Sequence, residues 1–104
     1  MYKIKKMSQL LLIKKGDFKS GFFSKLNAGE FHFYEDRIIF HTKGWSRLFN
    51  SAPIIIEKSS VLSFTEGFTI IGYTIKLNTK NGDFTMRLIG EKLEVYRILN
   101  AYIA

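Results

Sequence analysis

The residue types best suited to contact an anion or a lipid surface are crowded into the stretch KKGDFKSGFFSK, residues 14–25. A loop of this composition could press aromatic rings into a lipid headgroup region, while each lysine near an anionic surface contributes about 1 kcal/mol. The candidate lipid- or anion-binding residues are Lys14, Lys15, Lys19, Phe22, Phe23 and Lys25. In the alternative interpretation, the phenylalanines of this stretch, Phe18 included, fold back onto the core.

A second set of residues could contact a partner protein. Trp45, Arg47 and Phe49 lie close together in the sequence, and Trp and Arg are enriched at interface centres. Trp45 could equally cover an open end of the fold. Lys76 and Arg87 are expected to face each other across two neighbouring strands, which is unfavourable for like charges. An anion or an acidic group could relieve this repulsion, or both long side chains could extend into water.

Neither a metal site nor a catalytic site is predicted. The chain has no cysteine, which excludes thiolate zinc ligation and disulfides. His32 and His41, with Glu30 opposite His41, could begin a metal site, but no further ligand is expected to converge there. The sequence also lacks the nucleophile-elbow, phosphate-loop and metalloprotease motifs. We therefore predict a protein that has no cofactor and no enzymatic activity.

Length and composition predict one soluble domain. A chain of 104 residues that is 46% hydrophobic and 24% charged suits a single globular core. Its longest aliphatic run, residues 10–13, is far shorter than the roughly 20 residues that span a bilayer. The basic start, residues 1–7, lacks the long apolar segment and cleavage site of a secretory signal. We expect a cytoplasmic protein with a basic leader, located at the inner face of the membrane if it binds lipid.

The positive charge is concentrated near the N-terminus. Residues 1–25 contain seven lysines and one acidic residue, whereas the rest of the chain has nine basic and eight acidic residues. This asymmetry favours an anionic partner such as a membrane, an acidic protein patch or a nucleic acid, although it could simply aid solubility. Lysines outnumber arginines 12 to 4, which suits the reading of nucleic-acid bases poorly.

The clearest structural signal is a hairpin centred on Asn81-Gly82, a dipeptide typical of type I′ turns. Pairing outward from that turn sets Lys80 opposite Asp83 and Lys76 opposite Arg87. The predicted inner face of this hairpin consists of Ile75, Leu77, Thr79, Phe84, Met86 and Leu88.

A second hairpin is predicted in GEFHFYEDRIIFHTKG, residues 29–44, with Glu35-Asp36 at its tip. A Glu-Asp pair is unsuited to a primed turn, so we expect a longer or bulged loop. The side chains predicted to face the core are Phe31, Phe33, Ile38 and Phe40.

Further strands are expected at residues 9–14, 53–64 and 67–75, with turns at residues 58–60 and 66–68 and a bulge at Gly72. Only the C-terminus has helical periodicity. A helix over residues 91–103 would have one apolar face, formed by Val95, Ile98, Leu99 and Tyr102. Six or seven strands followed by one helix predict an antiparallel barrel that the helix caps.

The segment GEFHFYEDRIIF, residues 29–40, resembles the glycine–aromatic–turn–Arg-Ile-Ile-Phe hairpin of bacterial pleckstrin-homology-like and GRAM domains. The later strands and the terminal helix follow in the order of those families over about residues 8–103. The resemblance implies a seven-stranded, strongly bent barrel that binds phosphoinositides, other lipids, peptides or proteins. The arginine of the family's phosphate-binding loop has no counterpart in residues 14–25, which argues against specific phosphoinositide recognition.

The sequence therefore predicts a single pleckstrin-homology/GRAM-like domain over residues 1–104 that acts as a non-catalytic binding or adaptor module. We expect a protein or peptide partner, which could add a strand to an open sheet edge beside the helix. The first alternative is peripheral binding to an anionic membrane through the basic aromatic stretch. Non-specific binding to nucleic acid is the second alternative, and a homo-oligomer is left open.

Overall fold

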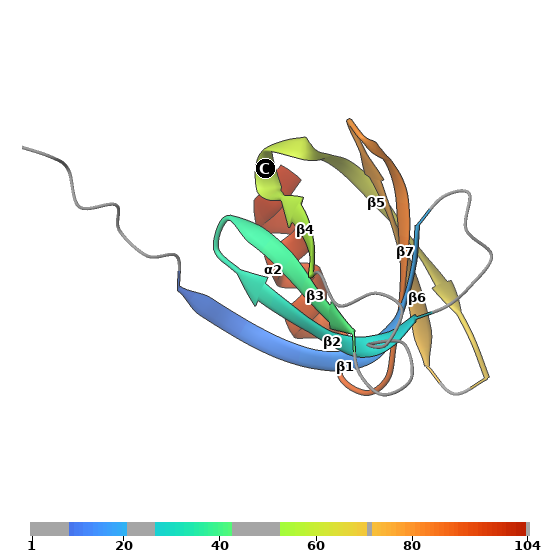
Figure 1. The fold of residues 1–104 in the computed structure, drawn as a ribbon. Helices are drawn as coiled ribbons and strands as arrows, with labels where there is room; N and C mark the ends of the chain where they lie inside the picture. The colour runs from blue at the N-terminus through green and yellow to red at the C-terminus, as the bar shows by residue number, and fades with distance from the viewer. Residues whose placement is uncertain (1–8, 21–26, 43–52, 71, 104) are drawn as a thin grey trace, which may run out of the picture.

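The computed structural model describes residues 9–20, 27–42, 53–70 and 72–103 (Figure 1). Seven strands precede one helix. The strands are β1 (Leu10–Ser20), β2 (Asn27–Tyr34), β3 (Arg37–Thr42), β4 (Ile54–Glu57), β5 (Val61–Phe68), β6 (Tyr73–Thr79) and β7 (Gly82–Leu88). One 3-10 turn, η1 (Lys58–Ser60), joins β4 to β5, and helix α2 (Leu93–Ile103) follows β7.

All seven strands form one antiparallel sheet in the order β4-β3-β2-β1-β7-β6-β5. The long strand β1 joins its two halves, because residues 10–18 pair with β2 and residues 16–20 pair with β7. Figure 1 shows the sheet curving around α2. The fold is thus mainly β with a C-terminal helix, consistent with a pleckstrin-homology-like barrel capped by a helix, and the predicted fold class is confirmed.

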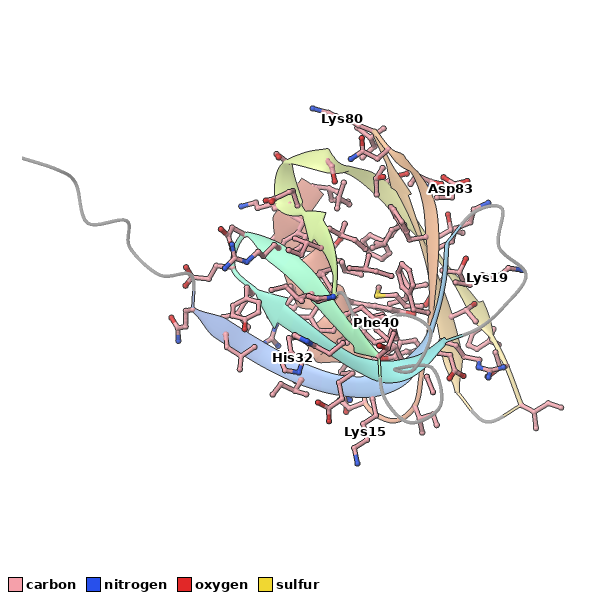
Figure 2. The ribbon with its side chains drawn as sticks, viewed as in Figure 1. Lys15, Lys19, His32, Phe40, Lys80 and Asp83 are labelled. Carbon is pink, nitrogen blue, oxygen red and sulfur yellow. The ribbon has the colours of Figure 1, made fainter. Side chains whose placement is uncertain are left out.

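Phenylalanines fill the centre of the barrel. The ring of Phe18 lies 5.1 Å from that of Phe40 and 5.6 Å from that of Phe84, and Phe31 lies 4.7 Å from Phe40, all between ring centroids. Phe40 points into the interior in Figure 2, whereas Lys15 and Lys80 project outward. Offset and tilted rings at these spacings contribute attraction beyond the burial of their area. The predicted core residues of the second hairpin, Phe31, Phe33, Ile38 and Phe40, are all buried.

Helix α2 closes the barrel through the apolar face predicted for it. Its buried side chains are Val95, Ile98, Leu99 and Tyr102. The helix begins two residues later than expected, after Glu91, whose carboxylate accepts a hydrogen bond from the Leu93 amide at 3.0 Å. Near its other end, the Tyr102 hydroxyl donates to the carbonyl oxygens of Tyr34 and Arg37. The helix is therefore fixed to the β2–β3 hairpin.

The predicted register of the β6–β7 hairpin is wrong by two residues. Thr79 pairs with Gly82, and Asp83 lies opposite Asn78 instead of Lys80. The cause is the Thr79 side chain, which donates to the Gly82 carbonyl at 2.7 Å and accepts from the Asn81 amide at 3.1 Å. The turn residues are therefore Lys80 and Asn81. A shift of two residues preserves both faces, so the predicted inner face is confirmed.

The β2–β3 hairpin has a two-residue tip, Glu35-Asp36, so the expectation of a longer or bulged loop was wrong. Hydrogen bonds to residues outside the hairpin hold this turn, although Glu and Asp do not favour its conformation. The Glu35 amide donates to the Gln9 carbonyl at 3.2 Å, and the Lys58 amide donates to the Asp36 carbonyl at 2.8 Å. The tip is thus held by its neighbours and not by residues that prefer a turn.

Two other local predictions also require correction. Residues 66–68 do not form a turn but continue β5, and the chain reverses at Thr69, whose amide donates to the Gly72 carbonyl at 3.0 Å. Gly72 precedes β6 and is not a bulge; a Cβ there would lie 2.2 Å from the Leu88 carbonyl oxygen. The turn predicted at residues 58–60 is confirmed as η1, whereas the predicted leader, residues 1–7, lies outside the described residues.

Gly29 is expected to tolerate no side chain, because a Cβ there would lie 2.1 Å from the His41 carbonyl oxygen and 2.8 Å from the Phe40 ring. We expect Gly29→Ala to lower the free energy of unfolding by about 1–3 kcal/mol through overpacking. Urea unfolding followed by circular dichroism measures this change. The adjacent exposed position supplies the control, since Ala28→Ser should change stability little. Equal stability of both variants would contradict the close approach of β2 and β3.

Candidate binding surfaces

Lys14, Lys15 and Lys19 lie on strand β1 and not on a loop, because β1 continues to Ser20. The sequence missed this extension, in which residues 15–18 pair with β2 and residues 16–20 pair with the distant strand β7. Phe18 is only 1% exposed, so it folds back onto the core as the alternative interpretation held. The remaining candidates of both predicted groups lie outside the described residues, namely Phe22, Phe23, Lys25, Trp45, Arg47 and Phe49.

Lys76 and Arg87 do not face each other, contrary to the predicted register. Thr85 lies opposite Lys76, and Thr74 lies opposite Arg87. Each cation has an acidic partner of its own, because the Lys76 ammonium lies 3.5 Å from the Asp83 carboxylate and Arg87 binds Asp17. The like-charge repulsion inferred from the sequence is therefore absent.

The Asp17–Arg87 ion pair joins β1 to β7. Arg87 donates from Nε to Asp17 Oδ2 at 2.9 Å, and its Nη2 donates to the same oxygen. Both side chains are partly buried, with exposed fractions of 23% for Asp17 and 37% for Arg87. They alternate along their strands with the buried Phe18, Met86 and Leu88, so they project from the outer face of the barrel. The pair thus marks the outside of the joint between the two halves of the sheet.

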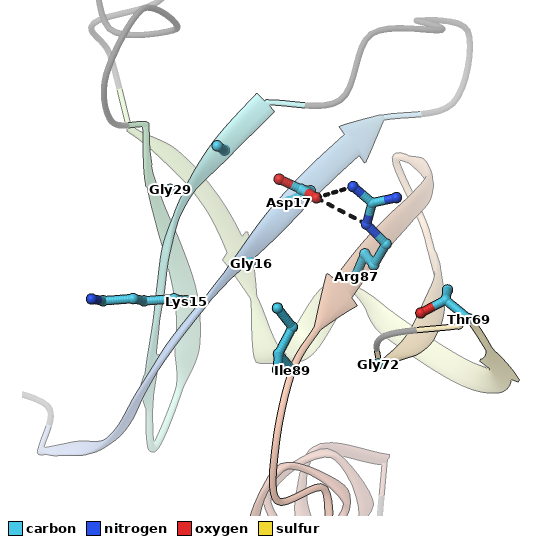
Figure 3. Close-up of a pocket in the computed structure, with 9 residues that line it drawn as sticks. Lys15, Gly16, Asp17, Gly29, Thr69, Gly72, Arg87 and Ile89 are labelled. Carbon is cyan, nitrogen blue, oxygen red and sulfur yellow. Dashed lines mark hydrogen bonds and ion pairs between the residues drawn. The ribbon is translucent and has the colours of Figure 1, made fainter.

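A pocket of about 360 Å³ opens beside this ion pair (Figure 3). Strands β1 and β2, the residues following β7, and the β5–β6 turn all contribute to its wall. Its lining residues are Lys15, Gly16, Asp17, Ala28, Gly29, Thr69, Gly72, Arg87 and Ile89. Most of the accessible surface of that wall is carbon. We refer to this site as the joint pocket.

A smaller hollow of about 240 Å³ lies on the same outer face, among Lys19, Lys76, Asp83 and Thr85. Lys19 is opposite Thr85, and Thr85 is opposite Lys76, so the two lysines flank one threonine across three strands. The sequence placed them in separate groups, since β1–β7 pairing has no local signal. Two lysines attract anions, but Asp83 offsets part of that charge. This hollow is therefore the weaker anion site.

The two histidines lie as the sequence predicted. His41 pairs with Glu30 across β2 and β3, and its ring lies 4.5 Å from that of His32, between centroids. Burial and the neighbouring His32 lower the pKa of His41, against the opposing effect of Glu30. His32 Nε2 lies 3.3 Å from Glu30 Oε1. Within the described ranges, no group of three His, Cys, Asp or Glu side chains could hold a metal ion.

Strand β5 and helix α2 meet through a cluster that the sequence did not reveal. The Tyr96 hydroxyl donates to Glu66, and the Lys92 ammonium lies 4.0 Å from the same carboxylate and 5.2 Å from the Phe68 ring centroid. Burial, followed by the hydrogen bond and charge of Glu66, raises the pKa of Tyr96 to about 12. Burial and Glu91 likewise raise the pKa of Tyr73 to about 12. These contacts link the beginning of α2 to β5, the strand at one end of the sheet.

Large apolar side chains are exposed around the β5–β6 turn. Ile70 is 102% exposed and Phe68 is 81% exposed, while Ile89 and Leu93 are also largely exposed. Where such side chains form one contiguous patch, the patch usually marks a contact with a partner or a membrane. No helix in the part of the chain that the structure describes is both long and apolar enough to cross a bilayer.

The fold is shared with at least one solved structure. The crystal structure of the C-terminal domain of an unknown protein from Leishmania infantum superimposes with a TM-score of 0.68 at 13% identity. The match covers 93% of this chain and 86% of the other. No family model matches the sequence, and no curated protein matches it significantly. The comparison supports the architecture alone.

The Asp17–Arg87 pair is expected to contribute measurable coupling across the joint. A double-mutant cycle with Asp17→Asn and Arg87→Gln should give about 1 kcal/mol in the free energy of unfolding, the upper end of the range for partly exposed pairs. Urea unfolding of the four proteins measures it.

A second double-mutant cycle, on the more exposed ion pair of Glu94 and Arg97, serves as the control. Their charged groups lie 3.3 Å apart on α2, and their exposed fractions are 51% and 76%. We expect a coupling of about 0.3–0.5 kcal/mol there. A coupling across the joint no larger than this control would contradict a stabilising role for the Asp17–Arg87 pair.

Proposed function

We propose that this protein is a non-catalytic binding module that accepts an extended peptide segment along β5. The observation that carries the proposal is the position of β5, an eight-residue strand that ends the sheet and lies beside α2. A terminal strand offers unpaired backbone groups on its outer side, which a peptide strand can bind. The resemblance of the sequence to pleckstrin-homology-like and GRAM domains supports a binding function of this kind.

The surroundings of β5 suit a peptide that alternates apolar and polar side chains. Leu62 at one end is 58% exposed and Phe68 at the other is 81% exposed. Between them, Phe64 packs against Tyr96 of α2, with 5.9 Å between ring centroids. Backbone pairing would provide affinity, and these side chains would select the residues of the partner. The other terminal strand, β4, has only four residues and offers a shorter template.

Peptides selected from a phage-displayed library against the whole protein should bind along β5. A selected peptide can be N-methylated either at its odd-numbered or at its even-numbered residues. One of these two modified peptides should bind at least tenfold more weakly than the unmodified peptide, and the other should bind about as well. The reason is that every second amide of an added strand points toward the sheet. Isothermal titration calorimetry measures the affinities, and amide chemical shifts locate the site.

Leu62→Glu should weaken selected peptides about tenfold, whereas Leu11→Glu should not. The two leucines have similar exposure, 58% and 44%, but Leu11 lies on β1. Equal sensitivity to N-methylation of both sets, or chemical-shift changes that avoid β5, would show that strand addition is wrong.

Contact with an anionic membrane is a second candidate function, supported by the exposed apolar side chains of the β5–β6 turn. Phe68 and Ile70 are exposed and lie outside residues 14–25, the stretch first suggested by the sequence, so they support this candidate at a second position. Lys92 lies beside Phe68, so apolar and cationic groups occur together. Such pairs bind the interface between lipid headgroups and acyl chains.

Phe68→Ser combined with Ile70→Ser should weaken co-sedimentation with phosphatidylserine-containing vesicles at least tenfold, because two apolar side chains would no longer enter the lipid. A Leu10→Ser and Leu11→Ser protein, altered at two exposed leucines of β1, is the control. A Phe22→Ser and Phe23→Ser protein tests the stretch first suggested by the sequence. Absence of salt-sensitive binding by the unaltered protein would remove this candidate.

A further inference from the structure

We propose that the joint pocket binds a small monocarboxylate with an apolar chain, such as a medium-chain fatty acid. This site is separate from the peptide edge on β5, and the proposal does not depend on peptide binding. The pocket volume of about 360 Å³ falls within the range of roughly 300–1,000 Å³ that small-molecule sites occupy.

The pocket wall is apolar apart from one end. Its lining residues include three glycines, Ala28 and Ile89, and Ile89 is 60% exposed. Burying these carbon atoms against an alkyl chain would release water from both surfaces. The rigid strands β1, β2 and β7 contribute most of this wall, so the pocket exists before a ligand arrives.

Arg87 is the group that can recognise a carboxylate. Asp17 holds the guanidinium through Nε and Nη2, and the third nitrogen points away from Asp17 in Figure 3. Among the described residues, that nitrogen has no hydrogen-bond partner. A guanidinium fixed in this way presents its remaining donors without further loss of side-chain freedom. Asp17 therefore acts as a positioning residue, and Arg87 supplies the contact.

The charges around the pocket favour an anion over a cation. Lys15 lines the rim, although its side chain extends away from the ion pair in Figure 3. The Lys14 ammonium lies next to Gly90, 3.7 Å from the point that a Cβ there would occupy. The neighbouring carboxylates are already engaged, Asp17 with Arg87 and Glu30 with His32. The excess positive charge beside the pocket thus comes from Lys14 and Lys15, because Asp17 offsets the charge of Arg87.

Thr69 of the β5–β6 turn also lines the pocket. Its hydroxyl oxygen is buried and has no hydrogen-bond partner among the described residues. Buried hydroxyl groups are nearly always paired in folded proteins. This oxygen has no surface open to the pocket, so Thr69 forms part of the wall and Arg87 remains the polar contact for a ligand.

Titration of the 15N-labelled protein with octanoate, octanol and octylamine tests this assignment. Below the micelle concentration, octanoate should give saturable shifts of the Gly16, Gly29 and Gly72 amides. We expect octanol to bind about tenfold more weakly, because it lacks the charge that Arg87 contacts, and octylamine to bind more weakly still. Arg87→Gln should remove the preference for octanoate over octanol.

Ala28→Leu fills the pocket from an exposed strand position and should abolish the shifts while the protein stays folded. The matched control, Ala101→Leu on the exposed surface of α2, should bind octanoate as the unaltered protein does. Absence of saturable shifts in the glycine amides, or undiminished binding by the Ala28→Leu protein, would overturn the proposed site. Equal binding of octanoate and octanol would overturn its assignment to a carboxylate.

Discussion

The pairing of β1 on both sides over residues 16–18 is the constraint on which the barrel depends. Gly16 has Gly29 as its partner on β2 and Leu88 as its partner on β7. A Cβ at Gly16 would lie 2.2 Å from the Arg87 carbonyl oxygen, so no larger residue fits. The two halves of the sheet can bend together only because their backbones approach this closely.

Three consecutive residues of β1 perform three different tasks at this joint. Gly16 allows the close approach, Asp17 binds Arg87 on the outer face, and Phe18 stacks inside between Phe40 and Phe84. Alternation along the strand separates the ion pair from the core. The joint pocket lies at the same place, because Gly16, Asp17 and Arg87 all line it.

Local pattern was sufficient to predict which face of the two hairpins and of the helix is buried. The alternation around Phe31 and Phe40 and the helical spacing around Leu99 record burial directly, so these side chains were assigned to the core correctly. The register of β6 and β7 was not predictable in this way, because hydrogen bonds of Thr79 decide it and a shift of two residues preserves both faces.

The candidate site was less accessible to sequence reasoning than the fold. Asp17 and Arg87 are 70 positions apart, and nothing local to either residue indicates that β1 pairs with β7. The outward position of each follows from alternation, but their contact follows only from the order of strands in the sheet. Lys19 and Lys76 were assigned to different groups for the same reason.

The two ends of the sheet differ in a way that bears on function. Exposed strand edges invite unwanted pairing, and proteins usually protect them by short length, charge or proline. Strand β4 meets the first condition with its four residues. Strand β5 has eight residues, no proline and a single charged side chain, Glu66, which Tyr96 and Lys92 already engage. Bulges and covering helices also protect strand edges, and β5 has both an irregular pairing between Val61 and Ser63 and α2 packed beside it. The two ends of the sheet are therefore protected by different means, β4 by its length and β5 by its neighbours.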